Sequence, residues 1–190
     1  MPKTSVDVIL TTAVKLFHER GFNEVSVDQI CQECGITKPT FYRYIPGKDD
    51  ILSAYYDRVC DDIALRFSDV YQADSYLEQF DLFYGMVVDS SLELGPSIIG
   101  HMLARDLERH GHSFDRREAL TKIAIPLIRK GQAAGEFMSP ATPEDLYDAV
   151  NFTFLGLEVK WALRDGEVDW KDDFRRVAHA ILGVNGAAER

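Results

Sequence analysis

The first third of the chain has the apolar periodicity of short amphipathic helices. Apolar residues recur at intervals of three and four across Val6–Phe17, and Gly21 follows them as a stop signal. A second helix is predicted over Val27–Cys34, because Ser26 and Gln29 have the spacing of a capping box in front of it. We therefore expect two helices before residue 35.

A third short helix is predicted directly after a glycine turn. Thr37 can cap it, and Pro39 falls in its first turn, where a missing N–H costs nothing. The helix should end before the break at Pro46-Gly47. Two short helices that meet at a tight turn and follow a supporting helix are the pattern of a helix-turn-helix, whose second helix enters the DNA major groove.

The side chains of this third helix fit that interpretation. Phe41 and Tyr44 share one face and should pack inward, which leaves polar and cationic side chains on the outer face. From Gly35 to Lys48 the chain has three positive charges and no acid. The predicted helix-turn-helix therefore has a basic tip.

After residue 47 the helices lengthen, and the whole chain is predicted to be all-α. One apolar stripe runs over Ile51–Phe67, and Thr142-Pro143 has the cap and the proline of another helix start. Since no long segment alternates with a period of two, we expect about nine helices and no sheet. A domain boundary is expected between residues 1–47 and 48–190.

Charge distinguishes these two parts. The 190 residues carry 21 basic and 31 acidic side chains, a formal net charge of −10, and 46% of them are hydrophobic. This is a globular composition, and its acidity excludes an overall basic protein. Residues 1–50 are nearly neutral, so the acidity belongs to residues 51–190, where it would discourage nonspecific adhesion to DNA.

The segment Ile9–Val59 resembles the DNA-binding domain of TetR-family bacterial transcriptional regulators. The resemblance rests on Gly21-Phe22 at the end of the first helix, the Gly-Ile-Thr-Lys turn at 35–38, Thr40-Phe41-Tyr42, and the Gly47-Lys48-Asp49 start of the fourth helix. It implies a repressor that binds a palindromic operator as a homodimer. It also implies a helical C-terminal domain that dimerises and binds a small-molecule inducer.

Chemistry and the resemblance together indicate the DNA contacts. Cationic side chains can bond guanine edges or phosphates, hydroxyl groups can bond base edges, and a proline can pack on a thymine methyl. Tyrosines and a lysine next to the helix suit phosphates, which set register without reading sequence. The expected contact residues are Ser26, Thr37, Lys38, Pro39, Thr40, Tyr42, Arg43, Tyr44 and Lys48.

The C-terminal part is rich in large apolar side chains, most of which should form a core. The helix expected at 143–163 is apolar nearly all round, so it should be buried on two sides, one of them against a dimer partner. An apolar and aromatic lining suits a hydrophobic or aromatic inducer. The expected inducer contacts are Phe83, Tyr84, Val87, Met102, Ile123, Leu127 and Phe152.

Other functions have less support in the sequence. Cys31 and Cys34 have the spacing of a redox or metal motif, and they stand where the family usually has alanine, but on a helix they should act as small core residues. A thiol-redox sensor, or a helical protein that binds only a small molecule, is the alternative. No nucleophile elbow, P-loop or H-E-x-x-H motif occurs, so we expect no enzyme, metal or cofactor.

The sequence also predicts a cytoplasmic protein with no membrane partner. The longest run without a formal charge is Val177–Ala188, well short of the roughly 18 residues that suggest a membrane span. The N-terminus meets Asp7 before an apolar signal region can develop.

Overall fold

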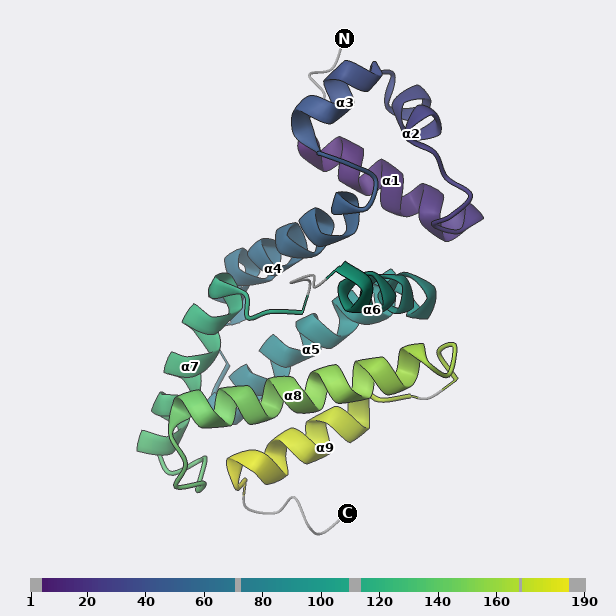
Figure 1. Ribbon diagram of the computed structural model, residues 1–190. Coiled ribbons are helices and arrows are strands. Elements are labelled where there is room, and N and C mark those ends of the chain that lie inside the picture. The colour runs from purple at the N-terminus through teal and green to yellow at the C-terminus, as the bar shows by residue number, and fades with distance from the viewer. Residues whose placement is uncertain (1–4, 71–72, 110–113, 168, 185–190) are drawn as a thin grey trace. The chain divides into compact units, whose positions relative to one another are not determined.

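The structure is a computed structural model that describes residues 5–70, 73–109, 114–167 and 169–184 (Figure 1). Within those ranges the chain is all-α, as the sequence predicts, and none of its helices is both long and apolar enough to cross a membrane. The elements of this part are α1 (Val6–Arg20), α2 (Val27–Cys34), α3 (Lys38–Tyr44), α4 (Asp50–Val70), α5 (Tyr76–Leu94), α6 (Pro96–Arg109), α7 (Glu118–Ala133), α8 (Pro143–Ala162) and α9 (Lys171–Leu182).

The helices pack as two compact units. The N-terminal unit comprises Met1–Val59 with Gly100–Ser113, and the C-terminal unit comprises Cys60–Ile99 with Phe114–Arg190. Most of α6 therefore belongs with the N-terminal helices, and α4 contributes residues to both units. The domain boundary expected after residue 47 is a functional division, and it stays a prediction.

The N-terminal unit is built on α1, against which α2 packs, and α3 packs against α2 in turn. Ser5 caps α1 by accepting a hydrogen bond from the backbone N–H of Val8 at 3.4 Å. Gly21 ends the helix with a φ of 87°, a value that side chains disfavour. The core of this unit includes large apolar residues exposed by 2% or less, among them Ile9, Leu10, Ile30, Phe41, Ile45, Ile51 and Leu52.

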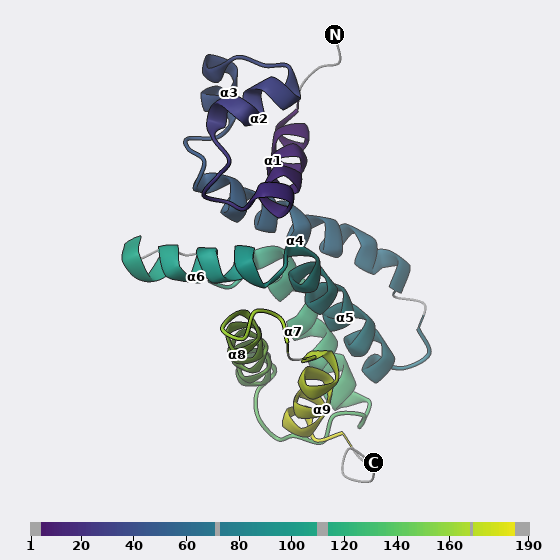
Figure 2. The ribbon, with the colours of Figure 1, turned by 90° about the vertical axis from the view of Figure 1, so that its right-hand side faces the viewer.

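The C-terminal unit is a helical bundle with an aromatic core. α7 and α9 each pack against both α5 and α8, and Figures 1 and 2 both show α8 and α9 side by side. The ring centroids of Phe154 and Trp170 lie 5.2 Å apart, and those of Tyr84 and Phe174 lie 5.4 Å apart. Aromatic contacts of this kind join α5, α8 and α9 into one core.

Candidate functional site

The short helix α3 is fixed by local hydrogen bonds at its start. Thr37 Oγ1 accepts from the backbone N–H of Thr40 at 3.4 Å and lies 3.0 Å from Thr40 Oγ1. Pro39 occupies the first turn, and Ile45 ends the helix in an extended conformation. Both the cap and the proline are where the sequence predicts them.

The turn before α3 is equally constrained. In the capping box of α2, Ser26 Oγ accepts from Gln29 N at 3.3 Å, and Ser26 N donates to Gln29 Oε1 at 2.7 Å. Gly35 then takes the left-handed conformation with a φ of 64°, which glycine adopts without strain. The capped start of α2 and this glycine fix the direction in which α3 leaves the turn.

The inner side of α3 differs from the prediction at one residue. Phe41 is fully buried, as expected, but Tyr44 is 39% exposed. Because α3 ends at Tyr44 and the chain becomes extended at Ile45, it is Ile45 that enters the core. Helical spacing predicted an inward Tyr44 because it assumed that the helix continued.

The outer side of α3 carries polar, cationic and aromatic groups. Lys38, Pro39, Tyr42 and Arg43 are exposed. The Arg43 guanidinium lies 5.0 Å from the centroid of the Tyr44 ring, so the two side chains lie close together on the surface. Such a surface can hydrogen-bond both base edges and phosphates.

An acid that the sequence reasoning missed lies beside this surface. Lys38 Nζ is 2.9 Å from Asp28 Oδ1, and both side chains are exposed. The pKa of Lys38 is raised, chiefly by this hydrogen bond. The stretch from Gly35 to Lys48 has no acid of its own, but α2 supplies one from ten residues earlier.

Lys48 is placed in an unexpected way. Its ammonium donates to the backbone carbonyls of Phe22 and Val25, both at 2.9 Å, and lies 4.3 Å from the centroid of the Phe22 ring. The half-buried side chain therefore braces the loop between α1 and α2. The sequence held no signal for this contact, because it joins residues more than twenty positions apart.

Two residues of α6, Arg105 and His101, contact other helices and loops of the N-terminal unit. Arg105 donates to Asp50 Oδ1 at 3.0 Å and to the carbonyl of Asp49, at the start of α4. The His101 ring lies 3.8 Å from the Phe22 ring, centroid to centroid, and its pKa is lowered, mainly by burial. A histidine and an arginine four residues apart on α6 thus anchor that helix within the N-terminal unit.

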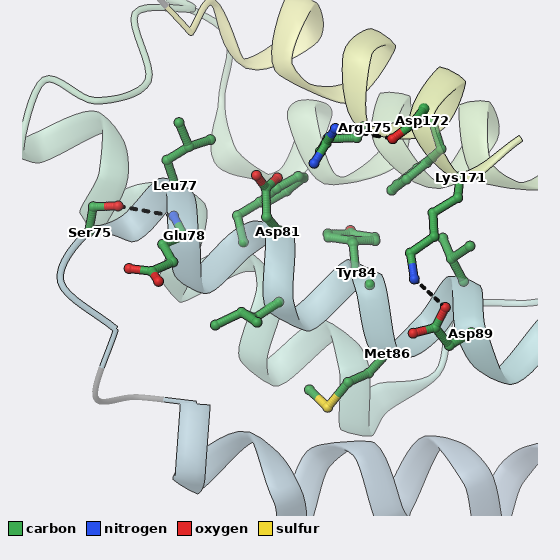
Figure 3. Close-up of a pocket in the computed structure, with 15 residues that line it drawn as sticks. Ser75, Leu77, Glu78, Asp81, Tyr84, Met86, Asp89, Lys171, Asp172 and Arg175 are labelled. Carbon is green, nitrogen blue, oxygen red and sulfur yellow. Dashed lines mark hydrogen bonds and ion pairs between the residues drawn. The ribbon is translucent and has the colours of Figure 1, made fainter.

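The C-terminal unit contains a cavity of about 570 Å³ between α5 and α9 (Figure 3). Aromatic rings of Phe80, Tyr84 and Phe174 contribute to its lining. Figure 3 shows Lys171 reaching from α9 to Asp89 on α5, with which it forms an ion pair. The volume of the cavity lies within the roughly 300–1,000 Å³ that is usual for small-molecule pockets.

A smaller cavity of about 170 Å³ lies among α4, α5 and α7. Its apolar lining includes Ile123 and Leu127, both expected inducer contacts, together with Phe67. Lys122 and Lys130 also line it, so it combines apolar walls with positive charge.

Comparison with known proteins identifies the N-terminal unit. The sequence model of a family described as bacterial regulatory proteins of the tetR family matches residues 9–55. Residues 9–55 are therefore similar in sequence to this family. The residues that carry the match include the whole of α2 and α3, as the resemblance in the sequence predicts.

Curated relatives of the TetR type extend the match. EthR of Mycolicibacterium smegmatis is 27% identical over 131 residues, which are 69% of this chain and 51% of that protein. An uncharacterised regulator, YuxN of Bacillus subtilis, is 42% identical over 60 residues, or 30% of this chain and 21% of that protein. The matched part of the chain thus spans only a fifth to a half of the length of these curated relatives. These relatives are transcriptional regulators rather than enzymes, the class that the sequence predicts.

Solved structures of regulators share this fold over nearly the full length of the chain. FadR of Bacillus halodurans has a TM-score of 0.72 at 17% identity and covers 99% of this chain and 100% of its own. FadR of Thermus thermophilus, in complex with lauroyl-CoA, has a TM-score of 0.71 at 17% identity, with 94% and 93% covered. At this identity the likeness establishes the fold alone.

The residues expected to bind a TetR-type inducer fall in several places. Phe83, Tyr84 and Val87 are buried on α5, and Tyr84 lines the larger cavity. Met102 belongs to the N-terminal unit, and Phe152 is 72% exposed on α8. Neither of the two cavities contains all seven residues, and their role stays a prediction.

The core of the C-terminal unit also holds a carboxyl group that the sequence did not single out. Glu158 on α8 is 1% exposed, and its Oε1 has no hydrogen-bond partner within the described part of the chain. Burial raises the pKa of Glu158 to about 7, an effect that the polar side chain of Ser91 partly offsets. The local sequence, an acid within an apolar stretch of helix, does not indicate that the acid is buried.

The cysteines are poorly suited to redox chemistry. Cys31 is buried and Cys34 half-buried, and burial is the main cause that raises the pKa of each thiol. A raised pKa lowers the fraction of reactive thiolate. Among the described residues no group of three potential ligands could hold a metal ion.

Proposed function

We propose that this chain is a ligand-responsive transcriptional repressor that acts in the cytoplasm and binds a palindromic operator as a homodimer. The observation that carries the proposal is α3. A buried Phe41 anchors a capped helix whose opposite side presents Lys38, Tyr42 and Arg43 to solvent. A helix held in this way can enter the major groove without losing its support.

The proposed DNA contacts divide into two classes. Lys38, Thr40 and Arg43 are suited to base edges, and Pro39 to a thymine methyl. The phosphate contacts would come from the flanking helix starts and the tyrosines, which set register. The set is the one expected from the sequence, Ser26, Thr37, Lys38, Pro39, Thr40, Tyr42, Arg43, Tyr44 and Lys48.

The proposed homodimer uses the outer side of α8. One side of this helix buries Phe154 and Trp161, whereas Phe152 on the other is largely exposed in a single chain. A second copy that packs α8 and α9 against the same helices would cover this apolar surface about a two-fold axis. We expect Phe152→Glu to produce monomers in analytical ultracentrifugation and to weaken operator binding, with Lys160→Glu on the same helix as the charge control.

We propose that the inducer binds in the C-terminal unit and is largely apolar with a charged group. The larger cavity supports this because aromatic rings line it, and its charged lining pairs Lys171 with Asp89 and Arg175 with Asp172 beside Glu78 and Asp81. Acyl-CoA thioesters, such as the one in the Thermus thermophilus FadR complex, combine an apolar chain with anionic groups. Such a ligand is therefore a suitable first probe.

The proposed response to ligand uses α4. This helix continues from the N-terminal unit into the C-terminal unit, so its displacement would change the separation of the two α3 helices in a dimer. Half-sites lie about 34–36 Å apart or a multiple of that, so a change of a few ångströms would prevent simultaneous docking.

A selection from random DNA tests the proposal directly. Full-length protein is incubated with a library of randomised duplexes, and bound DNA is sequenced over several rounds. We expect the selected DNA to contain an inverted repeat that the protein binds as a dimer. The affinity of the protein for this DNA, measured by fluorescence anisotropy, should fall when lauroyl-CoA is added. Failure to enrich any sequence would contradict DNA recognition, and unchanged affinity with ligand would contradict this ligand class.

A further inference from the structure

The ion pair between Asp28 and Lys38 lies on the surface proposed to face DNA. Asp28 is in the first turn of α2 and Lys38 is the first residue of α3, and their side chains are 70% and 51% exposed. An exposed ion pair adds little to stability. The place of Asp28 in the first turn of α2 favours the helix dipole, but an acid there also repels phosphates, so affinity for DNA leaves its presence unexplained.

The two charged atoms match a base pair in spacing and in polarity. Lys38 Nζ, a donor, lies 2.9 Å from Asp28 Oδ1, an acceptor. In the major groove a G·C pair presents the O6 acceptor of guanine beside the N4 donor of cytosine. These two atoms share a Watson–Crick hydrogen bond, so they too lie about 2.9 Å apart.

We propose that Asp28 and Lys38 together read one G·C pair in each half of the operator. Lys38 donates to guanine O6 and N7, and Asp28 accepts from the N4 amino group of the paired cytosine. The ion pair need not break, because an ammonium has three donors and a carboxylate has four lone-pair sites. This inference rests on the proposed function and makes Asp28 a residue that determines its specificity.

The arrangement also discriminates against A·T and C·G pairs, whereas a T·A pair presents the same acceptor and donor and differs at this contact by lacking guanine N7 beside the acceptor. In an A·T pair the N6 donor of adenine would face the ammonium, and the O4 acceptor of thymine would face the carboxylate. A C·G pair in the reverse orientation sets donor against donor and acceptor against acceptor in the same way. Lys38 alone would detect guanine, whereas the pair of residues also detects the cytosine opposite it.

The experiment compares base preferences of four full-length proteins. The random-duplex selection is run on the wild type, Asp28→Ala, Asp28→Asn and Glu33→Ala, and affinities are then measured for duplexes that carry each substitution at each position of the selected site. Glu33 is exposed on the same helix, so Glu33→Ala is the matched control for lost charge. Circular dichroism confirms that each variant is folded.

We expect the wild type to favour G·C over A·T and C·G by about tenfold at one position per half-site, as a good paired contact would. Asp28→Ala should lose most of that preference at this position only. Asp28→Asn should retain it, because its amide oxygen still accepts a hydrogen bond, and Glu33→Ala should leave it unchanged.

The outcomes separate this inference from the proposed function. A wild type that selects no sequence contradicts DNA recognition itself. A wild type that selects an operator, while Asp28→Ala changes affinity equally at all positions, shows that Asp28 acts through charge alone and overturns the inference. The same conclusion follows if Asp28→Asn behaves like Asp28→Ala.

Discussion

The two units of this chain place their polar side chains in opposite ways. In the N-terminal unit the buried side chains of α1–α4 are apolar, and the polar groups of α3 are at the surface. Among the described residues the buried polar side chains are Gln79, Ser91 and Glu158, all in the C-terminal unit. A surface for DNA needs a rigid interior behind it, whereas an interior with unsatisfied polar atoms can accept a polar guest.

This contrast predicts opposite responses to the removal of a group from each core. Deletion of an apolar anchor from the N-terminal unit leaves a cavity and destabilises the protein. Neutralisation of a buried acid in the C-terminal unit removes a desolvation penalty and stabilises it. The two units can be followed separately, because both tryptophans, Trp161 and Trp170, belong to the C-terminal unit.

The largest effect is expected for Phe41→Ala. The side chain is fully buried, so its truncation should cost about 3–5 kcal/mol of stability and abolish operator binding. Urea unfolding followed by circular dichroism measures the loss. The control is the neighbouring substitution Tyr42→Ala, which removes an exposed ring and should weaken DNA binding with little effect on the free energy of unfolding. An unfolding midpoint for Phe41→Ala equal to that of the wild type would contradict the role of this anchor.

The next largest effect is expected for Glu158→Gln, and it depends on pH. The pKa of Glu158 is about 7 in the folded protein against an ordinary value of 4.5. The folded state therefore binds the proton more tightly, and the wild type loses stability as the pH rises from about 4.5 to 7. The variant lacks this loss, so it should be more stable than the wild type by up to about 3 kcal/mol above pH 7.

Tryptophan fluorescence during urea unfolding at pH 5 and pH 8 measures this difference. Glu93→Gln, an exposed acid on α5, provides the control and should show no such dependence. If Glu158→Gln destabilises the protein equally at both pH values, the carboxylate has a partner in solution, and the contrast between the two units is weaker than proposed.

The sequence predicted the N-terminal unit more completely than the C-terminal one, for a physical reason. Caps such as Ser26 and Thr37, and the left-handed Gly35, act within four residues, so their consequences can be seen in local spacing. The braces from Lys48 to Val25 and from Arg105 to Asp50 join residues 23 and 55 positions apart, and no local pattern encodes them.

The sequence predicted that apolar and aromatic residues would line the candidate ligand site, but not which individual residues line it. Periodicity indicates one apolar side on α5, and α8 is apolar nearly all round, but neither pattern says which side meets a neighbour within the chain and which stays exposed. Phe152 and Phe154 are therefore alike in the sequence, yet one is 72% and the other 7% exposed. That difference depends on where α7 and α9 pack against α8, which is a property of the tertiary fold.

A smaller effect, about 1–3 kcal/mol of destabilisation, is expected for Gly131→Ala. A Cβ at this position would lie 2.3 Å from the ring of Phe137, which is buried against Phe80 and cannot easily move. Gly85→Ala is the matched control in the same unit, because no atom beyond the adjoining helix backbone lies within 4 Å of its added Cβ. Gly85 lies inside α5, where alanine should either leave the stability of the protein unchanged or raise it by up to about 1 kcal/mol. Fluorescence-detected unfolding of both variants measures the difference, and equal midpoints would show that the Phe137 ring yields.

The smallest effect on stability is expected for Lys48→Met, which keeps the apolar stem but removes the ammonium. Loss of the hydrogen bonds to Phe22 and Val25 should cost about 1–2 kcal/mol in urea unfolding of the N-terminal unit. If the ammonium also neutralises a phosphate, the slope of log affinity for the selected operator against log salt should fall by about one. We expect both changes. A stability loss with an unchanged slope would restrict Lys48 to bracing the α1–α2 loop, and the N-terminal unit would then present its DNA contacts from α2 and α3 alone.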